Sequence, residues 1–275
     1  MIELLPENFS RAAPLLADLG RALLARAVLE GCNPGWVFVD DPARPASAWI
    51  GLPCGYLFAL GRSPQPAQYP ALAALIRREL VGRSRAAGNY GFLLRCGAAG
   101  WAELLPELLP GRTPLRIFRR SFRLDAGRFA AVAQSLGPLP PGLELERIQA
   151  GTLERFPELR EELLVNWRGV EDFLRDGLGV AITRGAELAA WCLSPFACSA
   201  GFELSVFTAP DFRRQGLARR AAAAFLGLCL PLAKTPNWEC FWDNLPSTNL
   251  ALSLGYVFEE DAPVYYWEES PSGLG

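Results

Sequence analysis

One stretch constrains this chain more than any other, residues 202–218 (FELSVFTAPDFRRQGLA). Its first half alternates in side-chain direction, which predicts a strand that points Glu203 toward one face. Pro210 ends the strand, because proline has no N–H to donate to a ladder. The alanine-rich run at 221–230 then predicts an amphipathic helix. The stretch therefore predicts a strand, a tight basic turn and a helix, in that order.

The turn itself predicts an anion site. The first turn of a helix has N–H groups without an intrahelical partner, and the helix dipole adds to their pull on an anion. Gly216 lets a phosphate approach the backbone, and Arg213 and Arg214 add charge-assisted contacts. From these residues alone two interpretations stay open, a phosphate or pyrophosphate site and a solvated basic helix start.

The pattern Arg213-x-x-Gly216-x-Ala218 resembles the pyrophosphate-binding loop of the GNAT superfamily of acyl-CoA N-acyltransferases. Its setting is similar too, because a predicted strand at 238–242 follows the helix. Residues 254–256 (LGY) are then similar to the superfamily's "LGF".

The resemblance extends to a subgroup often called the GNAT acetyltransferase family, which includes the zwittermicin A self-resistance acetyltransferase. Residues 28–41, 167–179 and 190–194 are similar to that subgroup, so the match spans roughly 28–267. It implies an α/β fold of tandem GNAT-like domains, with mixed, mostly antiparallel central sheets flanked by helices.

The domain organisation follows from the linker candidate at 137–142, where proline and glycine are densest. The first half has a similar rhythm of helices and strands but lacks an Arg-x-x-Gly-x-Gly/Ala turn of its own. The resemblance therefore implies a degenerate N-terminal domain over 1–136 and an acetyl-CoA-binding domain over 143–275. Helices are expected near 14–30, 69–81, 100–109 and 153–165, and strands near 36–39, 48–52, 55–60, 90–95, 115–124, 143–148, 180–182 and 188–193.

Composition excludes several kinds of chemistry. The chain has no histidine, which removes Ser-His-Asp and Cys-His catalysis and the common zinc sites. Its seven cysteines form no CxxC motif, which favours reduced thiols and no metal site. The net charge of −2 gives no electrostatic reason to expect a nucleic-acid partner. No signal peptide or apolar run of membrane-spanning length is evident, so we expect a cytoplasmic protein without a membrane partner.

The resemblance implies acetyl-CoA as the cofactor and assigns residues to it. Backbone groups at the end of the strand would hold the pantetheine arm, the basic turn would bind the pyrophosphate, and two polar residues would contact the thiol end. Asn244 has a second interpretation as a helix cap. These residues are Val206, Phe207, Thr208, Arg213, Arg214, Gln215, Gly216, Leu217, Ala218, Asn244 and Ser247.

For the general base we favour Glu203. Burial between aromatic residues raises the pKa of a carboxylate, which suits it to proton transfer. The alternative is an ordinary polar residue on a strand face, or one that pairs with an arginine. Glu171 is a second catalytic candidate and Glu239 a third. For the substrate amine, the aromatic residues Trp167, Trp191 and Trp242 are candidates, with the protein core as the alternative.

The sequence departs from the family pattern at the residue that would act as the general acid. Many GNAT enzymes place a tyrosine four residues before the glycine of "LGF", and here that position is Ala251. Water or a hydroxyl such as that of Ser247 would then protonate the leaving thiolate, or catalysis would be weak.

The function we expect is an N-acetyltransferase that moves an acetyl group from acetyl-CoA to an amine of a small molecule, by direct attack in a ternary complex. An acyl-CoA-binding sensor or scaffold with little catalysis is the alternative, and acetylation of protein N-termini is a third. The acceptor and the oligomeric state stay open, because a fold does not determine its substrate.

Overall fold

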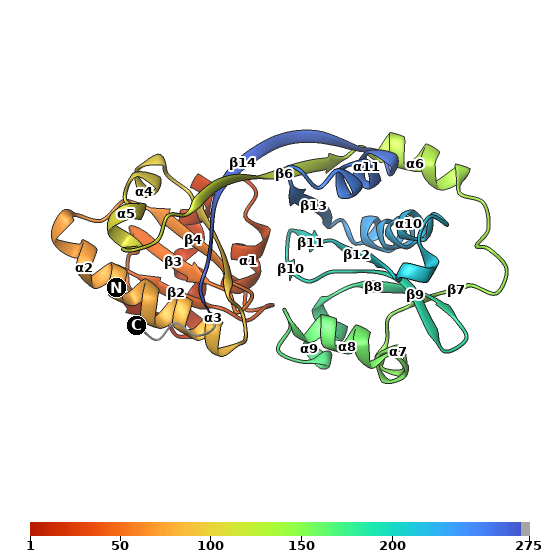
Figure 1. Ribbon diagram of the computed structural model, residues 1–275, viewed down its shortest axis with the longest axis horizontal. Coiled ribbons are helices and arrows are strands. Elements are labelled where there is room, and N and C mark those ends of the chain that lie inside the picture. The colour runs from red at the N-terminus through yellow and green to blue at the C-terminus, as the bar shows by residue number, and fades with distance from the viewer. Residues whose placement is uncertain (271–275) are drawn as a thin grey trace. The chain divides into compact units, whose positions relative to one another are not determined.

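The computed structural model describes residues 1–270, and two compact units make up the fold (Figure 1). Met1–Phe118 and the C-terminal segment from Pro263 form the first unit, and Arg119–Ala262 form the second. The chain passes from one unit to the other within two strands, β6 (Leu115–Leu124) and β14 (Tyr256–Glu268). Each unit combines a mixed sheet with helices, as expected of a tandem α/β fold.

The first unit contains a sheet in the order β1-β2-β3-β4-β5-β14. Its strands pair antiparallel except for β4 and β5, which run parallel. The strands other than β14 are β1 (Ile2–Glu3), β2 (Trp36–Val39), β3 (Ser47–Gly51), β4 (Tyr56–Gly61) and β5 (Gly91–Cys96). The helices are η1 (Pro6–Leu19), α1 (Leu23–Leu29), η2 (Pro66–Gln68), α2 (Tyr69–Leu75), η3 (Ile76–Val81), α3 (Gly82–Ala86), α4 (Ala99–Glu103) and α5 (Leu105–Leu108).

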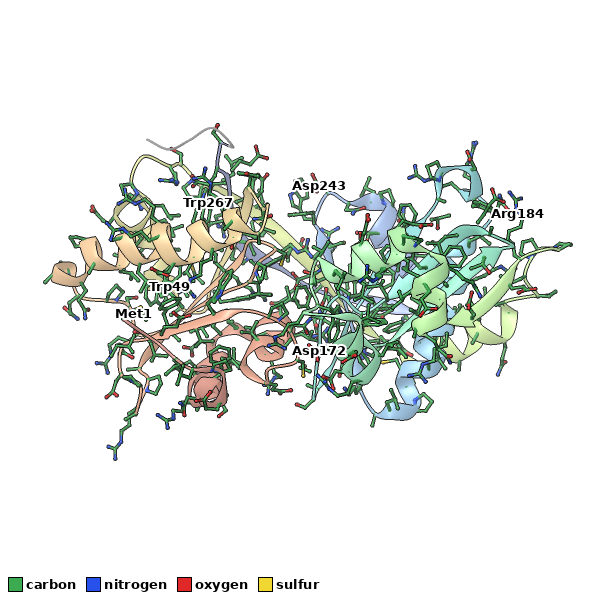
Figure 2. All side chains as sticks on the ribbon, turned by 90° about the horizontal axis from the view of Figure 1, so that it is seen from below. Met1, Trp49, Asp172, Arg184, Asp243 and Trp267 are labelled. Atoms are coloured by element: carbon green, nitrogen blue, oxygen red, sulfur yellow. The ribbon has the colours of Figure 1, made fainter. Side chains whose placement is uncertain are left out.

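Aromatic side chains fill the core of the first unit. Trp49 and Trp101 meet edge to face with ring centroids 5.5 Å apart, and Phe92 stacks on Trp267 at 5.3 Å. Figure 2 marks Trp49 and Trp267 among the densely packed side chains of this unit. Because Trp267 comes from β14, the C-terminal strand is part of this core.

The second unit holds a four-stranded sheet in the order β12-β9-β8-β7 and a set of strands in the order β14-β6-β13-β11-β10. The strands not yet given are β7 (Glu144–Arg147), β8 (Gly179–Arg184), β9 (Glu187–Leu193), β10 (Ala197–Cys198), β11 (Gly201–Glu203), β12 (Ser205–Thr208) and β13 (Thr235–Phe241). The helices are α6 (Ala126–Ser135), α7 (Ala150–Arg155), α8 (Pro157–Leu164), α9 (Val170–Asp176), η4 (Pro210–Phe212), α10 (Leu217–Cys229), η5 (Leu230–Leu232) and α11 (Leu245–Ser253).

Most expected elements occur close to their predicted positions, and β2 and β6 match residue for residue. The helix predicted over 14–30 is wrong in extent, because Gly20 adopts a positive φ of 62° and separates η1 from α1. The helices α6 and α9 and the long strand β14 were not predicted. No helix among residues 1–270 has the length and apolar character that a membrane crossing requires.

The two units differ in extent from the predicted halves. The expected linker lies within the second unit, where residues 136–143 form neither helix nor strand. Residues 119–136 belong to the second unit, since β6 pairs with β13 from Arg119 to Phe122. The end of β14 belongs to the first unit, since it pairs with β5 from Tyr265 to Glu268.

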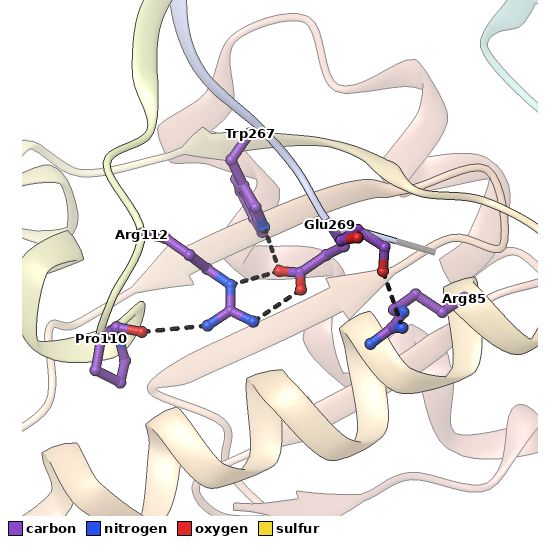
Figure 3. A network of polar contacts seen from close by, with 6 residues as sticks. Arg85, Pro110, Arg112, Trp267 and Glu269 are labelled. Carbon is purple, nitrogen blue, oxygen red and sulfur yellow. Dashed lines mark hydrogen bonds and ion pairs between the residues drawn. The ribbon is translucent and has the colours of Figure 1, made fainter. Parts of the chain in front are cut away.

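An ion-pair network fastens the C-terminal segment within the first unit (Figure 3). Arg112 donates from Nε and Nη2 to the two carboxylate oxygens of Glu269, and the Trp267 indole N–H donates to Glu269 Oε1 at 3.1 Å. Arg85 donates to the Ser270 carbonyl at 3.2 Å. The hydrogen bond from Arg112 outweighs the effect of burial and holds the pKa of Glu269 below its usual range.

Glu269→Gln should therefore destabilise the protein by about 1–2 kcal/mol at pH 7, because the Arg112 guanidinium loses a charged partner. The pKa of Glu269 is lowered on folding, so its contribution is present above the unfolded pKa and is lost as pH falls through the folded pKa. Urea unfolding of the full chain should show a constant difference from wild type between pH 8 and 6, which shrinks below about pH 4.5. The exposed Glu103→Gln is the control. A difference that grew as pH fell would contradict this assignment.

Candidate functional site

The candidate site begins where residues 201–208 change from pairing with β13 to pairing with β9. Glu203 in β11 pairs with Asn237 of the parallel strand β13, and the Leu204 N–H donates to the Asn237 carbonyl at 3.1 Å. From Ser205 onward the chain pairs instead with β9, from Ser205 opposite Leu193 to Thr208 opposite Ala190. The strands β12 and β13 therefore diverge beyond Leu204.

A cavity of about 490 Å³ lies between the diverging strands. It is formed by β12, β13, the start of α10, the start of α11 and the middle of β6. The lining residues are Arg119, Leu204, Ser205, Val206, Phe207, Thr208, Ala218, Trp238, Glu239, Cys240, Phe241, Asn244, Pro246, Ser247 and Leu250.

Backbone groups of β12 face this opening. Alternate residues of an antiparallel strand turn their N–H and C=O groups toward the partner strand. The N–H of Ala209, the residue just after β12, donates to the Ala189 carbonyl of β9, and the backbone groups of Phe207 point to the same side. Val206 and Thr208 accordingly direct their backbone groups toward the side of the cavity. Among residues 1–270, Thr208 Oγ1 is also a buried oxygen without a hydrogen-bond partner.

The basic turn adjoins one end of the opening. Arg214 and Gly216 have positive φ angles of 62° and 73°, and α10 begins directly after Gly216. A Cβ added at Gly216 would meet no atom within 4 Å, so the space above this backbone is open. Arg213 Nε donates to the Thr208 carbonyl at 3.3 Å, which fixes the turn to the end of β12. Such a turn before a helix N-terminus is a concavity for an anion.

The α11 side of the cavity is held by a helix cap. Asn244 Oδ1 accepts a hydrogen bond from the Ser247 N–H at 3.1 Å, so the capping interpretation of Asn244 is confirmed. The Trp238 indole N–H donates to Ser247 Oγ at 3.1 Å. Because that oxygen acts as the acceptor, the Ser247 hydroxyl proton stays available to another group.

The carboxylate candidates occupy different surroundings. Glu203 is buried, accepts a hydrogen bond from Asn237 Nδ2 and lies beside the cavity without lining it. Glu239 lines the cavity and pairs with Arg119, whose Nε lies 2.9 Å from its Oε1. Glu171 is exposed in the first turn of α9, away from the cavity lining.

The three tryptophans proposed for the substrate do not line the cavity. Trp167 is buried and its indole N–H donates to the Ser194 carbonyl at 2.9 Å, as a core residue would. Trp191 is also buried and stacks on Phe207 at 5.6 Å. Trp242 is 48% exposed, immediately after β13.

Sequence reasoning missed Arg119 and Cys240 as cavity residues. No local pattern in the sequence marks either residue. Arg119 lies beside β13 only because β6 pairs with that strand, and Cys240 contacts Thr248 of α11.

The seven cysteines are free thiols. Burial raises the pKa of Cys54 and of Cys229 to about 11, and of Cys96 to about 12, which keeps all three protonated near neutral pH. Within residues 1–270 no group of His, Cys, Asp and Glu side chains is arranged to hold a metal ion.

Comparisons with known proteins agree with this geometry. A family model described as GNAT acetyltransferase matches residues 13–265. The chain is 25% identical to the "Uncharacterized N-acetyltransferase YdfB" of Bacillus subtilis (strain 168), over 96% of this chain and 97% of that protein. It is 26% identical to a GCN5-related N-acetyltransferase-like protein from Streptococcus suis 89/1591, with a TM-score of 0.70 over 95% of this chain and 99% of the other.

A third structure is similar in fold alone. It is a tandem GNAT protein from the clavulanic acid biosynthesis pathway, 14% identical, with a TM-score of 0.63 over 99% of both chains. The tandem GNAT fold predicted from the sequence is thereby confirmed. The likeness to the zwittermicin A resistance subgroup stays a prediction.

Asn244→Ala should lower the free energy of unfolding by about 1 kcal/mol, because the Ser247 N–H at the start of α11 loses its acceptor. Asn244→Asp keeps an oxygen acceptor and should stay close to wild type. Denaturant unfolding of the three proteins measures both effects. Equal losses in the two variants would show that the cap does not hold this end of the cavity.

Proposed function

Because this chain belongs to the GNAT acetyltransferase family, we propose that it moves an acetyl group from acetyl-CoA to an amine of a small molecule. Membership supports an N-acetyltransferase activity in general, and the donor and acceptor are the proposal. The observation that carries it is the cavity between β12 and β13, which ends at an open basic turn. A phosphate-bearing cofactor with a long amide-containing arm needs both features together.

In the proposed complex the pyrophosphate lies at Gly216 and α10. The N–H groups of the first helical turn and the two arginines, Arg213 and Arg214, provide the positive potential. Amide groups of the pantetheine arm take the hydrogen bonds that Val206 and Thr208 direct toward the cavity. A backbone N–H of β12 polarises the thioester carbonyl.

Acetyl transfer proceeds by direct attack in a ternary complex. The amine nitrogen bonds to the carbonyl carbon, the amine loses a proton, and the C–S bond to CoA breaks. We assign the proton to Glu203, through a water molecule, because its carboxylate is buried beside the opening and hydrogen-bonded to the neutral amide of Asn237. Glu171 is the weaker candidate, since it is exposed on α9.

The leaving thiolate needs a donor other than the tyrosine common in the superfamily. Ala251 is fully buried within α11, and Tyr256 is buried with its hydroxyl donating to the Pro236 carbonyl at 3.1 Å. Ser247 lines the cavity and keeps its hydroxyl proton available, so we assign it a hydrogen bond to the leaving thiolate, which takes its proton from water.

A second function, acyl-CoA binding with little catalysis, is favoured by the alanine at position 251, where many GNAT enzymes have a tyrosine. Without a tyrosine at that position, the chain would bind acyl-CoA as a sensor or scaffold and release little CoA. Trp242, Trp191 and Trp167 stay candidates for the acceptor side, and a cytoplasmic location and an absence of nucleic-acid partners stay predictions.

Gly216→Asp should abolish acetyl-CoA binding, because it places a side chain and a negative charge in the open space above the turn. Calorimetry with acetyl-CoA and CoA should give micromolar binding for wild type and none for the variant. Gly216→Ala is the control for the positive φ alone and should cost about 1 kcal/mol of stability. Normal binding by Gly216→Asp would remove the turn from the cofactor site.

Glu203→Gln should lower the turnover number about 100-fold or more, since the amide cannot take a proton, while acetyl-CoA affinity changes little. CoA release with a panel of amines (tyramine, putrescine and glucosamine) measures turnover at several pH values. An enzyme should release CoA with at least one amine, whereas a sensor should bind acetyl-CoA without release. An unchanged rate in the variant would exclude Glu203 as the base.

A further inference from the structure

Two charged residues line the cavity. Among the described residues that line it, Arg119 and Glu239 carry the formal charges. Their side chains are 13% and 12% exposed. Arg119 donates from Nε to the Glu239 carboxylate at 2.9 Å and from Nη2 to the Glu239 carbonyl at 3.2 Å. Its guanidinium also lies 4.6 Å from the centre of the Phe241 ring.

The strand register explains this arrangement. Arg119 of β6 lies opposite Phe241 of β13, and Ser121 lies opposite Glu239. Arg119 and Glu239 are therefore diagonal neighbours on one face of the sheet, within reach of a long side chain. Three contacts orient the Arg119 guanidinium, and one of them, from Nε, holds the Glu239 carboxylate.

The pair lies at the end of the cavity away from the basic turn. The turn is fixed to Thr208, at the far end of β12. The divergence begins at Leu204 and Asn237, and Glu239 is two residues beyond Asn237. A cofactor whose phosphates occupy the turn and whose arm follows β12 thus brings its acyl group toward Ser205 and Glu239.

We propose that the Arg119–Glu239 pair selects the acyl donor and admits short, uncharged acyl groups only. An anionic acyl group would place its carboxylate beside Glu239, and a long aliphatic chain would remove water from an ion pair without replacing its hydrogen bonds. This inference rests on the proposed function, because it takes the cavity as the acyl-CoA site.

Binding of CoA, acetyl-CoA, malonyl-CoA and hexanoyl-CoA by calorimetry tests the proposal without an acceptor. Wild type should bind malonyl-CoA about 10-fold or more weakly than acetyl-CoA, because of like-charge repulsion in a partly buried site. Glu239→Gln keeps the side-chain shape and releases Arg119 for a carboxylate. It should reverse the preference in favour of malonyl-CoA. Loss of a merely structural ion pair would not improve binding of any ligand.

The double variant Arg119→Leu with Glu239→Leu replaces both charged side chains of the cavity with apolar ones, and it tests whether the ion pair excludes long acyl chains. It should bind hexanoyl-CoA about 10-fold more tightly than wild type does, since about two methylene groups gain an apolar wall. This variant also carries the test if Glu239→Gln fails to fold. Glu154→Gln, an exposed residue of α7, is the matched control and should leave every ratio unchanged.

The outcomes separate the two proposals. If all proteins bind CoA but neither variant changes the ratio of malonyl-CoA or hexanoyl-CoA to acetyl-CoA, the selection by Arg119–Glu239 is overturned and the cofactor site stands. Equal affinity of wild type for acetyl-CoA and malonyl-CoA overturns it as well. If wild type binds none of the four ligands, the proposed function fails, and the inference fails with it.

Discussion

The second unit depends on the change of hydrogen-bonding partner between β11 and β12, which follow each other directly in the chain. Residues 201–204 take their hydrogen bonds from β13, and residues 205–208 take theirs from β9. The change leaves one edge of β12 without a strand beside it, and backbone groups at such an edge need another partner. The basic turn at Gly216 and the capped start of α11 lie on either side of the same opening. The opening, more than any single side chain, makes this unit suitable for an extended ligand with amide groups.

The corresponding strand of the first unit keeps both partners. β4 pairs with β3 from Leu57 to Gly61 and with β5 from Tyr56 to Ala59, so the described residues show no divergence there. The chain then enters α2 through Pro66 and Pro70, without a glycine of positive φ directly before the helix. A closed pair of strands has no place for an acyl arm. This difference supports our proposal that the cofactor binds in the second unit and that the first is degenerate.

The sequence predicted local features well and distant pairings poorly. The turn at Gly216 and the strands around it follow from alternation, proline and glycine within some twenty residues. The crossing of β14 into the first unit depends on contacts between Trp267 and Phe92, far apart in the chain, which no local pattern contains. The burial of single tryptophans could not be predicted from local sequence either. Trp167 is in the core, whereas Trp242 is half exposed. The ion pair of Glu239 with Arg119 in the cavity depends on the pairing of β13 with β6, two strands far apart in the chain.

The absence of histidine and of a tyrosine at Ala251 places a chemical constraint on the proposed reaction. A thiol has a reference pKa of about 8.5, so a CoA thiolate is a far better leaving group than an alkoxide and needs little protonation before the C–S bond breaks. A hydrogen bond from Ser247 is then enough, provided that Trp238 keeps the hydroxyl oxygen in place as an acceptor. The amine is more demanding, because it must lose a proton as it attacks, and that step requires a base. On this reasoning the buried Glu203 matters more to the rate than the missing tyrosine does.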